Sequence, residues 1–186
     1  MSKKSQILDT ALRLFNVHSY STIGIDRIIE ESNVAKMTFY KYFPSKEKLI
    51  YECLLTRSME LKKSILADLD EQNTPLIQLK KIYEWHIRWF GSAEFNGCMF
   101  QKAMLNILVK YPSVIEPIND YRQWLHKTIS HIFLQMNIND RFLVDTFIFI
   151  LDGMIMQAKV QNFELNAEHN WTYILKMINL ELEKSC

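Results

Sequence analysis

Residues 32–49 read Ser32-Asn-Val-Ala-Lys-Met-Thr-Phe-Tyr-Lys-Tyr-Phe-Pro-Ser-Lys-Glu-Lys-Leu49. Asn33 marks a turn, because asparagine tolerates the left-handed backbone conformation better than most residues. A short helix is expected over residues 35–43. Pro44 ends it, and Ser45 is a suitable N-cap for the next helix. The stretch therefore predicts a turn, a short aromatic and basic helix, and the start of a longer helix.

Two further helices precede this stretch. Apolar residues recur at steps of three and four over residues 4–18, as on one buried face of a helix, at Ile7, Leu8, Ala11, Leu14 and Phe15. A second, short helix is marked by Ile25, Ile28 and Ile29. Gly24 can cap that helix, and Asp26 lies favourably near its N-terminus. Two short helices joined by a tight turn have the spacing with which one helix enters a DNA major groove while the other braces it.

The composition favours a compact all-α protein. Apolar residues make up 48% of the 186 residues, enough to bury a sizeable core. Four Gly and four Pro leave few turns, and no segment alternates apolar and polar residues over the length of a strand. The N-terminus does not resemble a signal peptide, and the longest apolar run, residues 147–151, is too short to span a bilayer. We therefore expect a cytoplasmic protein without membrane contact.

Charge and cysteine usage narrow the function classes. The net charge is +1, but the first 50 residues hold eight basic and five acidic side chains, which permits a basic binding end. The three cysteines lack Cys-x-x-Cys spacing, and the histidines show no spacing typical of metal ligands. We expect reduced thiols and no metal or other cofactor. For Cys98, two interpretations stay open: a redox-sensing thiol near a helix N-terminus, or a buried inert thiol.

Six longer helices are predicted after the quoted stretch. The polar run at residues 71–75 is the clearest break between them, with Pro75 at the start of a helix. The apolar periodicity places them at roughly 45–70, 75–91, 96–110, 113–136, 140–160 and 167–183. With the three N-terminal helices, the chain is expected to contain about nine.

The quoted residues resemble the signature of the TetR family of bacterial transcription regulators. That signature is a turn, a Thr-hydrophobic-Tyr-x-x-Phe helix, here Thr38 to Phe43, and a Ser-Lys-Glu-x-Leu opening, here Ser45 to Leu49. The resemblance covers about residues 5–54. It implies a helix-turn-helix DNA-binding domain over residues 1–46 and a helical ligand-binding and dimerisation domain over residues 47–186. By matching position it also implies DNA contacts from Lys36, Met37, Thr38, Tyr40, Lys41, Tyr42 and Lys46.

The chemistry of these residues agrees with that implication. Lysine can contact guanine acceptors or phosphates, Thr and Tyr can donate to phosphate, and Met37 can press on a thymine methyl group. Several positions depart from the family pattern, Ala35 and Gly24 among them. Ala35 stands where a serine normally caps the recognition helix, which weakens that helix by about 1 kcal/mol. Gly24 lacks the hydroxyl that family members often offer to phosphate.

The rest of the chain suggests an effector pocket and a dimer interface. Its middle segment is rich in aromatic and methionine side chains, which line adaptable pockets for small apolar or aromatic ligands; the expected pocket residues are Trp85, His86, Trp89, Met99, Met104, Tyr121 and Trp124. Simple core packing is the alternative for each of them. The last two helices are apolar on more than one face, which favours a homodimer through Phe147, Leu151, Met154, Ile174 and Ile178.

The resulting hypothesis is a transcriptional regulator, most simply a repressor. It binds a palindromic double-stranded operator as a homodimer and is released by a small-molecule effector. An enzyme is disfavoured, because the chain lacks Gly-x-Ser-x-Gly, His-Glu-x-x-His and a glycine-rich phosphate loop. The remaining alternative is a helical adaptor or ligand-binding protein that does not bind DNA. Binding that weakens steeply with salt separates the two interpretations.

Overall fold

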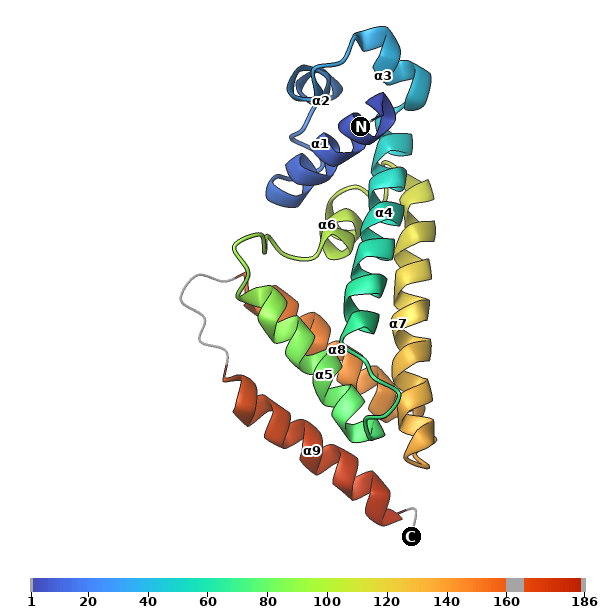
Figure 1. The fold of residues 1–186 in the computed structure, drawn as a ribbon, viewed down its shortest axis with the longest axis vertical. Helices are drawn as coiled ribbons and strands as arrows, with labels where there is room; N and C mark the ends of the chain where they lie inside the picture. The colour runs from blue at the N-terminus through green and yellow to red at the C-terminus, as the bar shows by residue number, and fades with distance from the viewer. Residues whose placement is uncertain (1, 160–165, 185–186) are drawn as a thin grey trace. The chain divides into compact units, whose positions relative to one another are not determined.

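The computed structural model describes residues 2–159 and 166–184, and every regular element within these ranges is helical (Figure 1). The elements are α1 (Lys3–Val17), α2 (Ile25–Ser32), α3 (Lys36–Tyr42), α4 (Lys46–Ala67), α5 (Pro75–Phe90), α6 (Met99–Asn106), the 3-10 turn η1 (Pro112–Val114), α7 (Ile115–Gln135), α8 (Arg141–Gln157) and α9 (Ala167–Lys184). The predicted all-α fold with an N-terminal helix-turn-helix is confirmed.

Side-chain caps fix the starts of several helices. The Ser2 hydroxyl accepts a hydrogen bond from the backbone N–H of Ser5 at the start of α1. Thr74 does the same for α5, whose first residue is Pro75. The Asp140 carboxylate accepts from two first-turn amides of α8. These polar side chains satisfy amide groups that have no partner inside a helix, so each helix begins at a defined residue.

Helix α6 is shorter than the sequence periodicity indicated. It begins at Met99, because Gly97 has a φ of 85° and holds the preceding residues out of helical conformation. It ends at Asn106, and the following residues form turns before η1. The expectation of a helix from 96 to 110 was therefore wrong at both ends.

The chain forms two compact units. The first contains Met1–Leu61 and Asn96–Tyr121, and the second contains Lys62–Phe95 and Arg122–Cys186. The predicted DNA-binding domain (residues 1–46) and ligand-binding domain (residues 47–186) do not coincide with these compact units. They stay a prediction about function. The first unit extends along α4 and includes α6, because side chains from this later segment pack and hydrogen-bond against α1 and the loop that follows it.

Each unit has its own apolar core. In the first unit α1, α3 and α4 contribute fully buried side chains, including Ile7, Phe15, Phe39, Leu49 and Leu54. In the second unit α5, α7, α8 and α9 contribute Leu79, Ile82, Phe133, Phe147 and Ile178. Among the described residues, no helix is both long and apolar enough to cross a membrane.

Candidate nucleic-acid interface

The turn between α2 and α3 is built around Asn33. This residue has φ 50° and ψ 48°, the left-handed conformation expected from the sequence. Its backbone N–H donates to the carbonyls of Ile29 and Glu30, and the Val34 N–H donates to the Ile29 carbonyl. These carbonyls in the last turn of α2 therefore have hydrogen-bond partners. The chain then changes direction and enters α3 through Ala35, which has extended backbone.

Helix α3 is oriented by the aromatic side chains that it buries. Phe39, on α3, and Phe43, directly after it, are both fully buried, with ring centroids 6.1 Å apart. Because 3.6 residues make a helical turn, burying Phe39 turns the opposite side of α3 outward. Of the predicted DNA contacts on α3, Lys36, Met37, Tyr40, Lys41 and Tyr42 are exposed and Thr38 is partly exposed. We call Met37, Tyr40 and Lys41 the outer face of α3.

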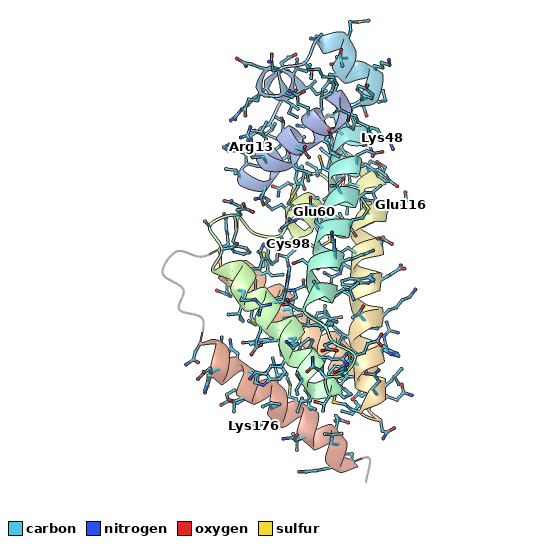
Figure 2. The ribbon with its side chains drawn as sticks, viewed as in Figure 1. Arg13, Lys48, Glu60, Cys98, Glu116 and Lys176 are labelled. Carbon is cyan, nitrogen blue, oxygen red and sulfur yellow. The ribbon has the colours of Figure 1, made fainter. Side chains whose placement is uncertain are left out.

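Ion pairs restrain some of the cations near this face. The Lys36 ammonium lies 3.3 Å from the Asp26 carboxylate of α2. The Glu31 carboxylate accepts hydrogen bonds from Arg13 (2.5 Å) and Arg27 (2.8 Å), which lower the pKa of Glu31. Arg13, labelled in Figure 2, thereby links α1 to α2. Arg13 thus connects two helices of the helix-turn-helix, and Arg27 pairs with Glu31 within α2.

Lys46 occupies a different environment from the one expected. Its ammonium donates to the Tyr20 carbonyl at 2.5 Å, and the side chain is half-buried at the start of α4. Burial, aided by the Lys110 charge, lowers the pKa of Lys46. A phosphate contact by Lys46 stays a prediction, and it requires this internal hydrogen bond to be exchanged. Lys48, labelled in Figure 2, lies nearby on α4 and is exposed. Its ammonium pairs with the Glu52 carboxylate at 3.0 Å.

The attachment of α6 to the helix-turn-helix was not predicted from the sequence. The Lys102 ammonium donates to the Phe15 carbonyl (3.0 Å) and the Asn16 carbonyl (2.6 Å) at the C-terminal end of α1. The Tyr20 hydroxyl donates to the Met99 carbonyl at 3.1 Å, and burial raises the pKa of Tyr20 well above its usual value. These partners lie about 80 positions apart in the chain, so no local pattern announces the contact.

The seven residues expected to line an effector pocket are divided between the units. Met99, Met104 and Tyr121 belong to the first unit, where Tyr121 stacks on Phe100 with ring centroids 4.7 Å apart. Trp85, His86, Trp89 and Trp124 belong to the second. In that unit the α5 side chains form an aromatic cluster, which also contains Phe90 and Phe95. The role of these residues in ligand binding stays a prediction.

His86 is a neutral core residue in this cluster. It is 1% exposed, and its Nδ1 lies 2.8 Å from the Ile82 carbonyl one turn earlier on α5. Burial lowers the pKa of His86 to about 4. At neutral pH the ring is therefore uncharged, and its Nδ1–H donates to the carbonyl.

A pocket of about 470 Å³ lies between α5 and α9 in the second unit. Tyr83 and Trp171 face each other there with ring centroids 5.3 Å apart, and the Tyr83 hydroxyl donates to the Ala167 carbonyl at 2.7 Å. The pocket is lined by Lys80, Tyr83, Glu84, Ile87, Arg88, Ala167, Glu168, Trp171 and Thr172. None of the residues expected from the sequence lines it. The spacing of α5 and α9, which no sequence pattern records, creates it.

The five residues expected at a dimer interface are buried within the single chain. Their exposed fractions are between 0% and 5% for Phe147, Leu151, Met154, Ile174 and Ile178. A residue contributes to association by losing accessible surface, and these have almost none to lose. Exposed apolar side chains of α8 and α9 lie elsewhere on the same helices: Phe142, Phe149, Met156, Tyr173 and Leu180.

The described cysteines are buried. Cys53 is fully buried on α4, and burial raises the pKa of its thiol. Cys98 is 7% exposed and precedes α6 as its N-cap residue (Figure 2). Cys186 lies outside the described residues. Within residues 2–159 and 166–184, no three His, Cys, Asp or Glu side chains gather into a potential metal site.

Known proteins resemble this chain in the sequence of its helix-turn-helix and in its fold. Residues 7–53 match the family described as bacterial regulatory proteins, tetR family. The HTH-type transcriptional regulator YxaF of Bacillus subtilis is 32% identical over 74 residues, which cover 39% of this chain and 39% of YxaF. The alignment therefore spans about two fifths of that relative's length.

Solved structures extend the likeness to nearly the whole chain. A TetR-family regulator from Streptomyces coelicolor has a TM-score of 0.78 at 22% identity, covering 98% of this chain and 95% of its own. The TetR-family regulator CifR, in a cysteine mutant, has a TM-score of 0.74 at 18% identity, with 98% and 96% covered. At these identities the likeness shows the fold, and the family match shows its N-terminal domain. Over residues 7–53 the chain is similar to the tetR family of bacterial regulatory proteins, and its fold is that of TetR-family regulators.

Proposed function

We propose that this chain is a repressor that binds a palindromic operator as a homodimer and is released by a small-molecule effector. The observation that carries the proposal is the outer face of α3, where Met37, Tyr40 and Lys41 are exposed while Phe39 anchors the helix from behind. A short helix held in this way fits the DNA major groove. The CifR structure, which was solved with 26-base-pair double-strand operator DNA, supports this use of the fold.

Side chains of α3 can make two kinds of contact with DNA: contacts with phosphates position the protein, and contacts with bases read the sequence. Lys41 and Lys36 supply positive charge for phosphates or guanine acceptors, and the hydroxyls of Tyr40 and Tyr42 can donate to phosphate oxygens. Asp26 competes for Lys36 in the free protein, since the two charges lie 3.3 Å apart. Binding therefore exchanges an internal ion pair for a contact with phosphate or base.

Dimerisation is proposed through the exposed apolar residues of α8 and α9. On α8, Phe142, Phe149 and Met156 recur every seven residues and are 83%, 65% and 51% exposed. On α9, Tyr173 and Leu180 repeat the interval and are 54% and 58% exposed. A heptad repeat keeps these side chains on one side of each helix. We call them the α8–α9 stripe. A second copy of the chain covers such a stripe with the same residues, as a two-fold interface requires.

A two-fold dimer presents two α3 helices to one side of a DNA duplex. Helix-turn-helix dimers read half-sites about 34–36 Å apart, one helical turn of DNA. The operator is accordingly an inverted repeat. An effector that binds one spacing of the two α3 helices better than another shifts the population between bound and released forms.

The pocket between α5 and α9 is the proposed effector site. Its aromatic pair, Tyr83 and Trp171, suits a small aromatic or apolar ligand, and its volume of about 470 Å³ is adequate for one. Helix α9 also carries part of the α8–α9 stripe. An effector seated against α9 therefore acts on an element that contributes to the proposed dimer interface.

Selection of bound fragments from a genomic DNA library tests the proposal. The wild type is expected to recover one inverted-repeat sequence, and Lys41→Ala is expected to weaken binding to it about tenfold, the effect of losing one charge-assisted contact. Lys127→Ala removes another exposed lysine, on α7, and serves as the matched control. Equal binding by both variants, or recovery of no specific sequence, contradicts the proposal.

The salt dependence of binding separates DNA from a protein partner. Each phosphate contact releases bound counterions, so affinity for operator falls steeply as salt rises, and loss of Lys41 reduces the logarithmic slope by about one. A slope that Lys41→Ala leaves unchanged favours the adaptor alternative.

A further inference from the structure

The outer face of α3 has no arginine, asparagine or glutamine for bidentate recognition of a purine. Arg or Lys pairs with guanine, and Asn or Gln with adenine, through two hydrogen bonds. Helix α3 reads Lys-Met-Thr-Phe-Tyr-Lys-Tyr and contains only lysine from this set. The arginines in the preceding helices, Arg13 and Arg27, both donate to Glu31. Hydrogen-bond readout of purines by this helix therefore depends on its lysines and is directed to guanine.

Met37 is the exceptional residue on this face. It is 84% exposed, although methionine is usually buried. It lies one turn from Lys41, so the two share a face, while Phe39 points to the core. The residues around it, Lys36, Tyr40 and Lys41, all have a polar end that water or phosphate satisfies. Met37 has none, and the folded chain leaves its thioether arm in solvent.

Met37 therefore fits an apolar feature of the DNA major groove. The only apolar group that base pairs present there is the C5-methyl group of thymine. The unbranched, polarizable methionine side chain adapts to such a small target. We propose that Met37 is a specificity-determining residue that reads a thymine methyl group in each operator half-site. This inference rests on the proposed function, since it assigns a base preference to the same α3 surface.

Replacement of thymine by deoxyuridine tests the inference directly, because it removes only the methyl group. Starting from the operator recovered by fragment selection, each thymine is replaced in turn at symmetric positions of both half-sites. For the wild type, one position is expected to lower affinity by about fourfold per methyl group, the effect of burying one such group. Met37→Ala is expected to bind the thymine and deoxyuridine operators equally, and Met37→Leu to keep the preference.

The controls separate this inference from the function on which it rests. Met59→Ala removes another exposed methionine, 63% exposed on α4, and is expected to keep the full thymine preference. Equal wild-type affinity for every deoxyuridine operator, or the same loss in Met37→Ala as in the wild type, overturns the inference and leaves the proposed function intact. Recovery of an operator whose half-sites contain no thymine also overturns the inference and leaves the proposed function intact. Failure to recover any operator overturns both.

Discussion

At the scale of single residues, His86 makes the stability of the protein depend on pH. Its pKa is about 4 in the folded chain because of burial, and 6.5 is its ordinary value. The unfolded chain therefore binds more protons between these two values, and stability falls as the pH drops from about 6.5 to 4. Above that window the contribution is fully present. The difference between the two pKa values corresponds to about 3 kcal/mol in the free energy of unfolding.

The His86→Gln variant checks this prediction. Glutamine keeps a hydrogen-bond donor for the Ile82 carbonyl and does not titrate. Denaturant unfolding of the wild type is expected to show a free energy that declines from pH 6.5 to 4, and the variant a smaller decline over the same window. His131→Gln, a change at an exposed histidine of α7, is the control. Parallel curves for His86→Gln and the wild type would refute this role for His86.

Ala35 offers a second residue-scale test. It is the N-cap of α3 and provides no side-chain hydrogen bond to the first-turn amides. A serine is expected at this position from the family resemblance, and its hydroxyl can accept from one of those amides. Ala35→Ser is therefore predicted to raise the free energy of unfolding by about 1 kcal/mol, measured by denaturant titration. A change within experimental error shows that the α3 N-terminus is satisfied in another way.

At the scale of elements, the attachment of α6 to α1 depends on Lys102. Its ammonium donates to two carbonyls at the end of α1, where the partial negative charge of the helix also favours a cation. Lys102→Met keeps the aliphatic arm and removes these bonds. The free energy of unfolding is predicted to fall by about 2 kcal/mol, the range of hydrogen bonds to charged groups.

Hydrogen exchange locates the effect of Lys102→Met. Amides in the last turn of α1, such as that of His18, which bonds to the Leu14 carbonyl, are expected to exchange faster in the variant. Lys63→Met on α4 replaces an exposed lysine and is the control. Unchanged exchange in α1 together with unchanged stability would mean that Lys102 does not hold α6 to α1.

At the scale of the whole molecule, the α8–α9 stripe predicts a dimer of this 22.2 kDa chain. Phe149→Asp places a charge on the exposed stripe, so sedimentation is expected to show a folded monomer in place of the wild-type dimer. Ile178→Asp is a poor test, because Ile178 is fully buried and the charge would unfold the chain. Met59→Asp on α4 is the matched exposed control. A wild-type protein that sediments as a monomer contradicts the proposed interface.

The Gly153→Ala variant distinguishes an α8–α9 stripe that is covered by a second copy of the chain from one that is exposed to solvent. Gly153 lies four residues after Phe149 on α8, and an added Cβ meets nothing within 4 Å in the single chain. A glycine inside a helix can permit a close approach by another helix, but no helix of the described chain approaches Gly153 in this way. In a monomer Gly153→Ala would stabilise α8 by up to about 1 kcal/mol. In the dimer the methyl group instead occupies the proposed contact surface, so the same change weakens association.

The sequence by itself determined the local structure of this protein. Apolar periodicity, the left-handed Asn33 and the break at Pro75 are encoded within a few residues, so the helices and the helix-turn-helix could be predicted. The exposure of Met37 and Lys41 followed from the same local geometry, because burying Phe39 fixes the rotation of α3. The residues proposed to contact DNA come from one short segment, and the resemblance of that segment to the TetR family implied them; their contacts with DNA stay a prediction.

Only the tertiary structure decided which apolar faces are covered. Both sides of α8 are apolar in sequence, and packing within the second unit buries Phe147 while Phe149 stays exposed. The tertiary structure also directs the Lys46 ammonium to the Tyr20 carbonyl, and the Lys102 ammonium to the Asn16 carbonyl at the end of α1. These contacts link residues far apart in the chain. Their geometry depends on how helices pack against one another, which no local periodicity records.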